Sequence, residues 1–242
     1  MKILIRIAVF LAVFVLVLIW RFPYDALVES SIRKAESATN ATITYQPVSA
    51  GPLGVKVSDL QINMPSGAAI RFDSAKLFPT TSGARVTALQ GENEMKATLS
   101  PTSLHLDLKD ISVDTGSSGI GTARATGDLQ YGLNSREGKG TLRLVIPELK
   151  LPLPVDPAME ISAAYTIRKV GEGKQARAGV SADVNLLNKD ITANGTISLE
   201  GQPAPARPAI SGNLNYEHKT LGRGSLQLGG TWDNPSIKTI PK

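Results

Sequence analysis

The chain has 242 residues, of which 19% are charged, and its formal net charge at pH 7 is +5. Its Lys and Arg residues are scattered without a basic run, which argues against nucleic-acid binding. Cysteine is absent, so disulfides, catalytic thiols and thiolate metal sites are excluded.

Residues 3–22 form an apolar stretch that carries charge only at Arg6 and Arg21. Twenty helical residues span about 30 Å, which matches the hydrocarbon core of a bilayer. The stretch ends in Trp-Arg-Phe-Pro and lacks the small residues of a cleavage site, so we expect an anchor rather than a cleaved signal peptide. Lys2 and Arg6 favour a cytoplasmic N-terminus, so residues 1–22 are predicted to be a cytoplasmic tail and a transmembrane helix. The predicted anchor includes Ile3, Phe10, Val15, Trp20 and Phe22.

Residues 23–40 have the pattern of a short helix next to this anchor. Pro23 suits the first turn of a helix, where its missing N–H is not needed. Glu29 comes early, and Arg33 and Lys34 come late, which complements the helix dipole. We therefore predict a juxtamembrane helix over these residues.

From residue 41 onward, apolar residues recur with a period of two, which is typical of strands with one apolar and one polar face. The alternation slips by one residue at Asp59 and again after Leu108. An extra residue of this kind indicates a β-bulge. Side chains predicted to share the apolar inner face include Leu142, Leu144, Val184, Leu186, Leu226 and Leu228.

The connections between these segments are short and rich in turn residues, so roughly a dozen strands are predicted to pair antiparallel in meander order. No helix is predicted beyond residue 40 to cover the apolar face, so the sheet must curl over itself. The expected fold is mainly β: an N-terminal transmembrane helix and a short helix, followed by an elongated, curled antiparallel sheet over residues 41–242. The sheet would form a groove, a sandwich or an open barrel.

Proline marks two interruptions in this region. Three prolines within residues 151–157 would either divide the sheet into two halves or form one long loop. The segment 224–230 is predicted to be the last strand. The sequence Asp233-Asn234-Pro235 would end it, because these residues favour a turn and Pro235 cannot donate to a ladder.

The clearest hint of chemistry is Asp114, which begins an Asp-Thr-Gly-Ser sequence like the catalytic loop of aspartic peptidases. Those enzymes need two carboxylates that share a proton, and the chain has no second Asp-Thr-Gly. The same residues are also common in hairpin turns. His105 and His218 have no neighbours at the spacing of metal ligands. No catalytic, cofactor-binding or metal-binding residue is therefore predicted.

Several segments together resemble the type II secretion system protein N family, in its Leptospira- and Geobacter-like form. They are the anchor, "RFPYDAL", "GPLGVKVSDLQINMPSG" and the closing "LQLGGTWDNPSIK". The resemblance implies a single-pass inner-membrane protein with a periplasmic β domain, accessory to the secretion machine. Its expected partners are other inner-membrane or periplasmic components of that machine, together with the membrane. No catalytic residue is implied.

The closing "GGTWDNP" also resembles the ends of AsmA-like proteins, which are anchored, β-rich proteins of envelope lipid homeostasis. Sequence analysis therefore leaves three functions open: a non-enzymatic secretion component, an AsmA-like lipid-handling protein and, third, an aspartic peptidase. The first two differ in the apolar face. A lipid conduit needs that face to remain open as a groove, whereas a scaffold does not.

Overall fold

The computed structural model of the chain describes residues 29–30, 32–34, 36–37, 40–51, 54–64, 67–116, 121–147, 158–171, 177–201, 208–220, 222–231 and 234–241. These residues confirm a mainly β protein built on one antiparallel sheet. The fourteen strands are β1 (Thr42–Gly51), β2 (Gly54–Asn63), β3 (Ala69–Thr80), β4 (Gly83–Gln90), β5 (Asn93–Leu99), β6 (Ser103–Asp114), β7 (Thr122–Gly132), β8 (Glu137–Ile146), β9 (Met159–Val170), β10 (Arg177–Asn188), β11 (Ile191–Glu200), β12 (Ala209–His218), β13 (Gly222–Thr231) and β14 (Asn234–Pro241).

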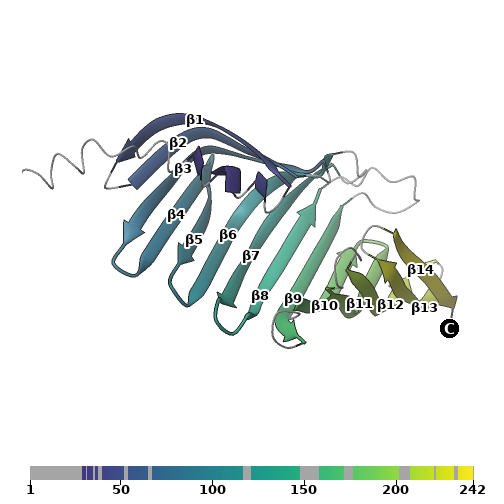
Figure 1. Ribbon diagram of the computed structural model, residues 1–242. Coiled ribbons are helices and arrows are strands. Elements are labelled where there is room, and N and C mark those ends of the chain that lie inside the picture. Colours follow the sequence, from purple (N-terminus) through teal and green to yellow (C-terminus); the bar gives the residue numbers. More distant parts are fainter. Residues whose placement is uncertain are drawn as a thin grey trace, which may run out of the picture.

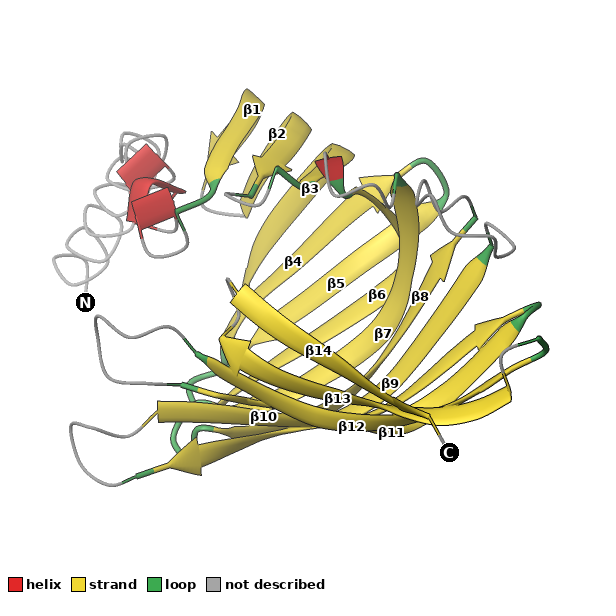
Figure 2. Ribbon diagram, turned by 90° about the vertical axis from the view of Figure 1, so that its right-hand side faces the viewer, coloured by secondary structure: helices red, strands yellow, loops and turns green. Residues whose placement is uncertain are grey.

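Each strand pairs with the next one along the chain, so the topology is the predicted meander. The sheet curls along its length, as Figures 1 and 2 show. It does not close into a barrel, because β1 and β14 each pair with one neighbour only. No second sheet covers it among the described strands, which excludes a sandwich for this part of the chain.

The proline-rich segment 151–157 lies outside the described residues, but the strands on either side of it are defined. β8 and β9 pair directly, from Gly138 with Ile167 to Ile146 with Met159. The sheet therefore runs without a break past this segment, and its strands are not divided into two halves.

Both predicted bulges are present. Asp59 has a φ of 48° and sits where the register between β1 and β2 shifts. Asp110 has a φ of 53° and sits in the register shift of β6 between Leu108 and Ile111. Aspartate tolerates this left-handed conformation better than most residues. The two bulges keep apolar residues on one face on both sides of each slip.

The side chain of Gln90 fills a gap where the β4–β5 hairpin ends. Its Nε2 donates hydrogen bonds to the carbonyl oxygens of Arg71 on β3 (2.7 Å) and Ser112 on β6 (3.1 Å). Its Oε1 accepts one from the Ser112 backbone N–H at 2.6 Å. The side-chain amide of Gln90 thus makes the hydrogen bonds to β3 and β6 that a backbone peptide group of an intervening strand would make. Beyond it, β3 pairs directly with β6 at Ala69 and Ile70.

The best-buried residues lie at the N-terminal end of the sheet. Phe72 on β3 and Ile111 on β6 are each only 2% exposed, and they belong to a cluster that spans β2 to β6. Its buried members are Val57, Phe72, Ala75, Ala88 and Ile111. This end of the curl forms a small closed core.

The N-terminal region is only partly described. Helical residues occur at 29–30, 32–34 and 36–37, which lie within the predicted juxtamembrane helix. The predicted anchor at residues 3–22 lies outside the described residues. Among the residues that are described, no helix is long and apolar enough to span a bilayer.

The prediction that the sheet ends at residue 230 is wrong. A fourteenth strand follows, and it pairs with β13 from Thr231 with Asn234 to Gly224 with Pro241. Asn234 and Pro235 begin this strand, so the turn residues here do not end the sheet. Ile237 and Ile240 of this strand are exposed.

Candidate functional site

The register of the sheet brings apolar side chains into continuous rows on one face. Directly opposed residues of antiparallel strands share a face, so each row can be followed from strand to strand. Two rows cross the thirteen strands from β2 to β14, which cover about 55–60 Å at a spacing of about 4.8 Å. The first row is Val57, Ala75, Ala88, Met95, Leu108, Gly127, Leu142, Ala163, Val184, Gly195, Leu214, Leu226 and Thr239. The second row is Val55, Leu77, Val86, Ala97, Leu106, Leu129, Gly140, Tyr165, Ala182, Ile197, Gly212, Leu228 and Ile237.

Two shorter rows flank these and widen the same surface, which we name the apolar face. Thr239 is the single member of the four rows that is neither apolar, aromatic nor glycine. The third row is Ile111, Ala125, Leu144, Ile161, Leu186, Ala193, Tyr216 and Gly224. The fourth row is Ala84, Leu99, Leu104, Tyr131, Gly138, Ile167, Val180, Leu199 and Ile210.

The structure places all six inner-face residues named from the sequence on this apolar face. Leu142, Val184 and Leu226 belong to the first row. Leu228 belongs to the second row, and Leu144 and Leu186 to the third. Each of the six is half-buried rather than fully buried. They therefore belong to a surface that is partly buried and still accessible to solvent.

The apolar face lies on the inside of the curl. On β8, for example, Leu142 and Leu144 are half-buried, whereas Thr141 and Arg143 between and beside them are exposed. No second layer packs on the described sheet that could bury one set of side chains and leave the other exposed. The difference in exposure between the two faces must therefore come from the curl, which shelters its inner face. Every buried hydrophobic residue of β4 to β11 lies on the same side of the sheet as these rows. The β9–β13 part of the face holds just one of them, Ala193, and remains open.

Glycine on the apolar face makes room for tyrosine rings on neighbouring strands. A Cβ built at Gly140 would lie 2.6 Å from the hydroxyl oxygen of Tyr165, and one at Gly224 would lie 2.5 Å from that of Tyr216. The Tyr165 hydroxyl donates a hydrogen bond to the Asp128 carbonyl at 2.9 Å. Burial raises the pKa of Tyr165, and the Asp128 carboxylate raises it further. Aromatic rings over glycines shield the backbone while the sheet curves.

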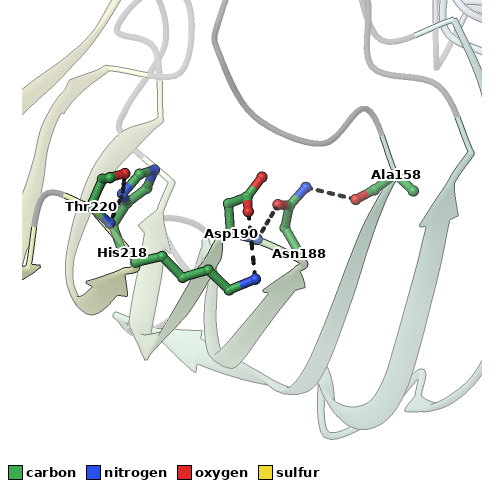
Figure 3. Close-up of polar contacts among 6 residues, drawn as sticks. Ala158, Asn188, Asp190, His218 and Thr220 are labelled. Carbon is green, nitrogen blue, oxygen red and sulfur yellow. Dashed lines mark hydrogen bonds and ion pairs between the residues drawn. The ribbon is translucent and has the colours of Figure 1, made fainter.

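Polar contacts fasten the hairpin ends along one edge of the apolar face (Figure 3). Asn188 is only 6% exposed. Its Nδ2 donates to the Ala158 carbonyl at 2.7 Å, and its Oδ1 accepts from the Asp190 N–H at 2.9 Å. The next hairpin joins through the Lys219 N–H, which donates to the Asp190 carbonyl at 3.0 Å. His218 accepts from the Thr220 N–H at 3.1 Å. These contacts tie three hairpins into one edge.

The opposite, outer face of the sheet is polar and carries exposed ion pairs. The guanidinium of Arg143 donates from Nε and Nη2 to the two carboxylate oxygens of Glu160, at 2.8 Å each. These hydrogen bonds lower the pKa of Glu160. The pair is solvated, so its contribution to stability is small. The chemistry of the molecule is therefore divided between a polar exterior and an apolar interior.

Asp114, the candidate peptidase residue, is exposed at the end of β6, where it pairs with Thr122. Its Oδ1 accepts a hydrogen bond from the Gly116 N–H at 2.9 Å, which is the geometry of an Asx turn. Thr115 completes the turn, because its hydroxyl donates to the Gly121 carbonyl at 2.6 Å. The Asp-Thr-Gly sequence is thus used to close a hairpin.

Neither histidine lies in a cluster of metal-type ligands. His105 is exposed on the outer face, and His218 contacts Thr220 in a turn. Within the described part of the chain, no group of three or more His, Asp or Glu side chains could hold a metal ion.

Comparisons with protein-family models, curated proteins and solved structures found no match for this chain.

Proposed function

We propose that this protein handles lipids in the cell envelope and holds their acyl chains against the apolar face. The observation that supports this is the continuity of the rows. Two of them run from β2 to β14 with Thr239 as their one polar member, and most of their side chains are half-exposed over the β9–β13 part. Apolar surfaces of this extent on soluble domains mark binding sites. Acyl chains suit the face because it offers contact along its length and few polar groups.

The proposed protein is non-enzymatic and anchored in the inner membrane by residues 3–22, with its sheet in the periplasm. The resemblance to AsmA-like proteins supports this arrangement, since it suggests a membrane-tethered β protein of lipid homeostasis. An open face in a tethered sheet would give acyl chains a path that water does not interrupt. This is the property that separates a conduit from a scaffold.

A role in type II secretion is the second proposal, supported by the resemblance of "GPLGVKVSDLQINMPSG" and "LQLGGTWDNPSIK" to the protein N family. The partners would be inner-membrane or periplasmic components of that machine. Such a role needs a contact surface rather than a continuous apolar face. The geometry of the sheet therefore favours lipid handling.

A photoreactive phospholipid with a diazirine in its acyl chain tests the first proposal. The full-length chain is crosslinked and the labelled peptides are identified, so that labelling of the predicted anchor is counted separately from labelling of the sheet. We expect labelled peptides from β9 to β13. The proposal is wrong if label is confined to residues 1–28.

Adjacent residues of β10 provide matched variants for this experiment. Val184 lies on the apolar face, and Asn185 lies on the outer face and is exposed. Val184→Asp should lose most of the labelling of β9 to β13, because a carboxylate among acyl chains is costly. Asn185→Asp adds the same charge on the other face and should label like the wild type.

A further inference from the structure

The hairpin ends along one edge of the sheet differ in character from those along the other. We name this edge the lower rim, and it comprises the β3–β4, β5–β6, β7–β8 and β9–β10 ends that lie along the lower side of Figure 1. Its residues with described side chains are 76–85, 99–104, 131–139, 167–171 and 179–180. The opposite rim comprises the hairpin ends on the other side of the sheet, from β2–β3 to β12–β13.

Exposed apolar side chains are concentrated on the lower rim. Five of the nine large hydrophobic residues that are exposed in the described structure lie there, each at least 39% exposed. They are Leu77, Phe78, Leu99, Leu133 and Val170. The fourth row of the apolar face runs along this rim through Leu99, Leu104, Tyr131 and Ile167. The rim is therefore continuous with the candidate lipid-binding surface.

Cations share this rim with the exposed apolar side chains. The described lower rim has one carboxylate, Glu137, and six Lys and Arg residues. They are Lys76, Arg85, Arg136, Lys139, Arg168 and Lys169. None of the six forms an ion pair with another described residue. An open hollow of about 670 Å³ lies on the outer face across the β6 to β9 ends, and its lining includes Glu137 together with His105, Lys139 and Arg168.

The opposite rim has paired charges instead. The five ion pairs among the described strands and turns all lie in the half of the sheet toward that rim. Arg124 pairs with Asp110, for example, and Lys219 with Asp190. Acidic and basic groups are balanced there, so that rim has little net attraction for an anion. The two rims are thus electrostatically distinct.

We propose that the lower rim docks on a lipid bilayer that presents anionic headgroups. Unpaired cations next to exposed apolar side chains are the combination that binds such a surface, the cations by attraction and the apolar groups by insertion. A docked bilayer would meet the apolar face along its fourth row. The inference deepens the proposed lipid-handling function, on which it rests, by naming the edge through which acyl chains enter or leave.

The absence of cysteine allows a single-probe test in the full-length chain. A fluorophore is attached at Asn134→Cys in the β7–β8 turn of the lower rim or, as the control, at Glu92→Cys in the β4–β5 turn of the opposite rim. Both positions are exposed. The protein is held in phosphatidylcholine nanodiscs. Vesicles that contain brominated, quenching phospholipid are then added, either as phosphatidylcholine alone or with phosphatidylglycerol.

We expect vesicles with phosphatidylglycerol to quench the probe at residue 134 and to leave the probe at residue 92 unchanged. Each cation near an anionic surface strengthens binding about fivefold. The triple variant Arg136→Gln, Lys139→Gln, Arg168→Gln should therefore weaken the vesicle affinity about a hundredfold. The matched variant Lys109→Gln, Arg124→Gln, Arg223→Gln removes the same charge elsewhere and should bind like the wild type.

Equal quenching at the two positions, or quenching that does not depend on phosphatidylglycerol, overturns the proposal. Equal loss in the two triple variants also overturns it, because only net charge would then matter. Acyl crosslinking of β9 to β13 in the wild type separates the two proposals. If that crosslinking is found while vesicle docking is not, the lipid site stands and the rim assignment falls.

Discussion

A Cβ atom at Gly140 would lie 2.6 Å from the hydroxyl oxygen of Tyr165, so the aromatic ring on β9 occupies the space that a side chain on β8 would need. The same Cβ would also clash with the Asp128 carbonyl oxygen on β7. The three strands therefore approach one another closely at this point of the apolar face. Glycine is required by packing here, since its φ is not in the left-handed region.

We expect Gly140→Ala to lower the free energy of unfolding by about 1–3 kcal/mol, the usual cost of overpacking. The clash involves backbone as well as a ring, so a side-chain rotation alone cannot relieve it. Urea denaturation of the full-length chain, followed by circular dichroism, measures the change. Gly91→Ala in the β4–β5 turn has open space around its Cβ but a φ of 59°, so it separates backbone strain from packing. An unchanged midpoint for Gly140→Ala would show that the sheet is looser than described.

The raised pKa of Tyr165 predicts a dependence of stability on alkaline pH. The folded protein holds this proton more tightly than the unfolded chain, whose tyrosines titrate near pH 10. The stabilisation is complete below that pH and is lost as the pH rises from about 10 toward the folded pKa. The stability difference between the wild type and Tyr165→Phe should therefore shrink above about pH 10. A difference that stays constant would show that folding does not perturb this hydroxyl.

The bridge formed by Gln90 predicts a second local effect. Gln90→Ala leaves the Ser112 N–H and the carbonyls of Arg71 and Ser112 without this partner, and we expect a loss of about 1–3 kcal/mol. Gln130→Ala is the control, because Gln130 is exposed on the outer face and should change stability by less than about 0.5 kcal/mol. Thermal melting compares the two. Hydrogen exchange at Ser112 should also accelerate in Gln90→Ala alone.

Much of the fold could be predicted because a strand with one sheltered face imposes a period of two on its sequence. The bulges at Asp59 and Asp110 were visible as slips in that period, since an extra residue must restore the apolar phase. The strand β14 was missed because "NPSIKTIP" begins with a turn signal and its alternation is weak. The same turn residues occur in hairpins and at the ends of sheets, so they do not show whether another strand follows.

The candidate site was predictable residue by residue but not as a surface. Leu142, Val184 and Leu226 could be assigned to an apolar phase, yet their membership of one row depends on register between strands, which a single strand does not encode. The lower rim was invisible for the same reason. Its six cations are scattered along the sequence and converge only when alternate hairpins share an edge.

The contrast between the closed and open parts of the apolar face gives the final prediction. Ile111 is 2% exposed within the cluster around Phe72, whereas Leu226 on β13 is half-buried. Removing a buried Ile side chain to alanine costs about 2–5 kcal/mol, because transfer and cavity terms add. A half-exposed Leu loses less contact and leaves no cavity, so Leu226→Ala should cost about 1 kcal/mol. Urea midpoints of the two full-length variants, measured without added lipid, give the comparison.

With phospholipid present, Leu226→Ala should weaken acyl crosslinking at β13, while Ile111→Ala should leave it unchanged wherever the protein remains folded. Equal costs for the two substitutions would mean that something covers the apolar face as completely at β13 as at β6, and the open groove would then be the wrong description.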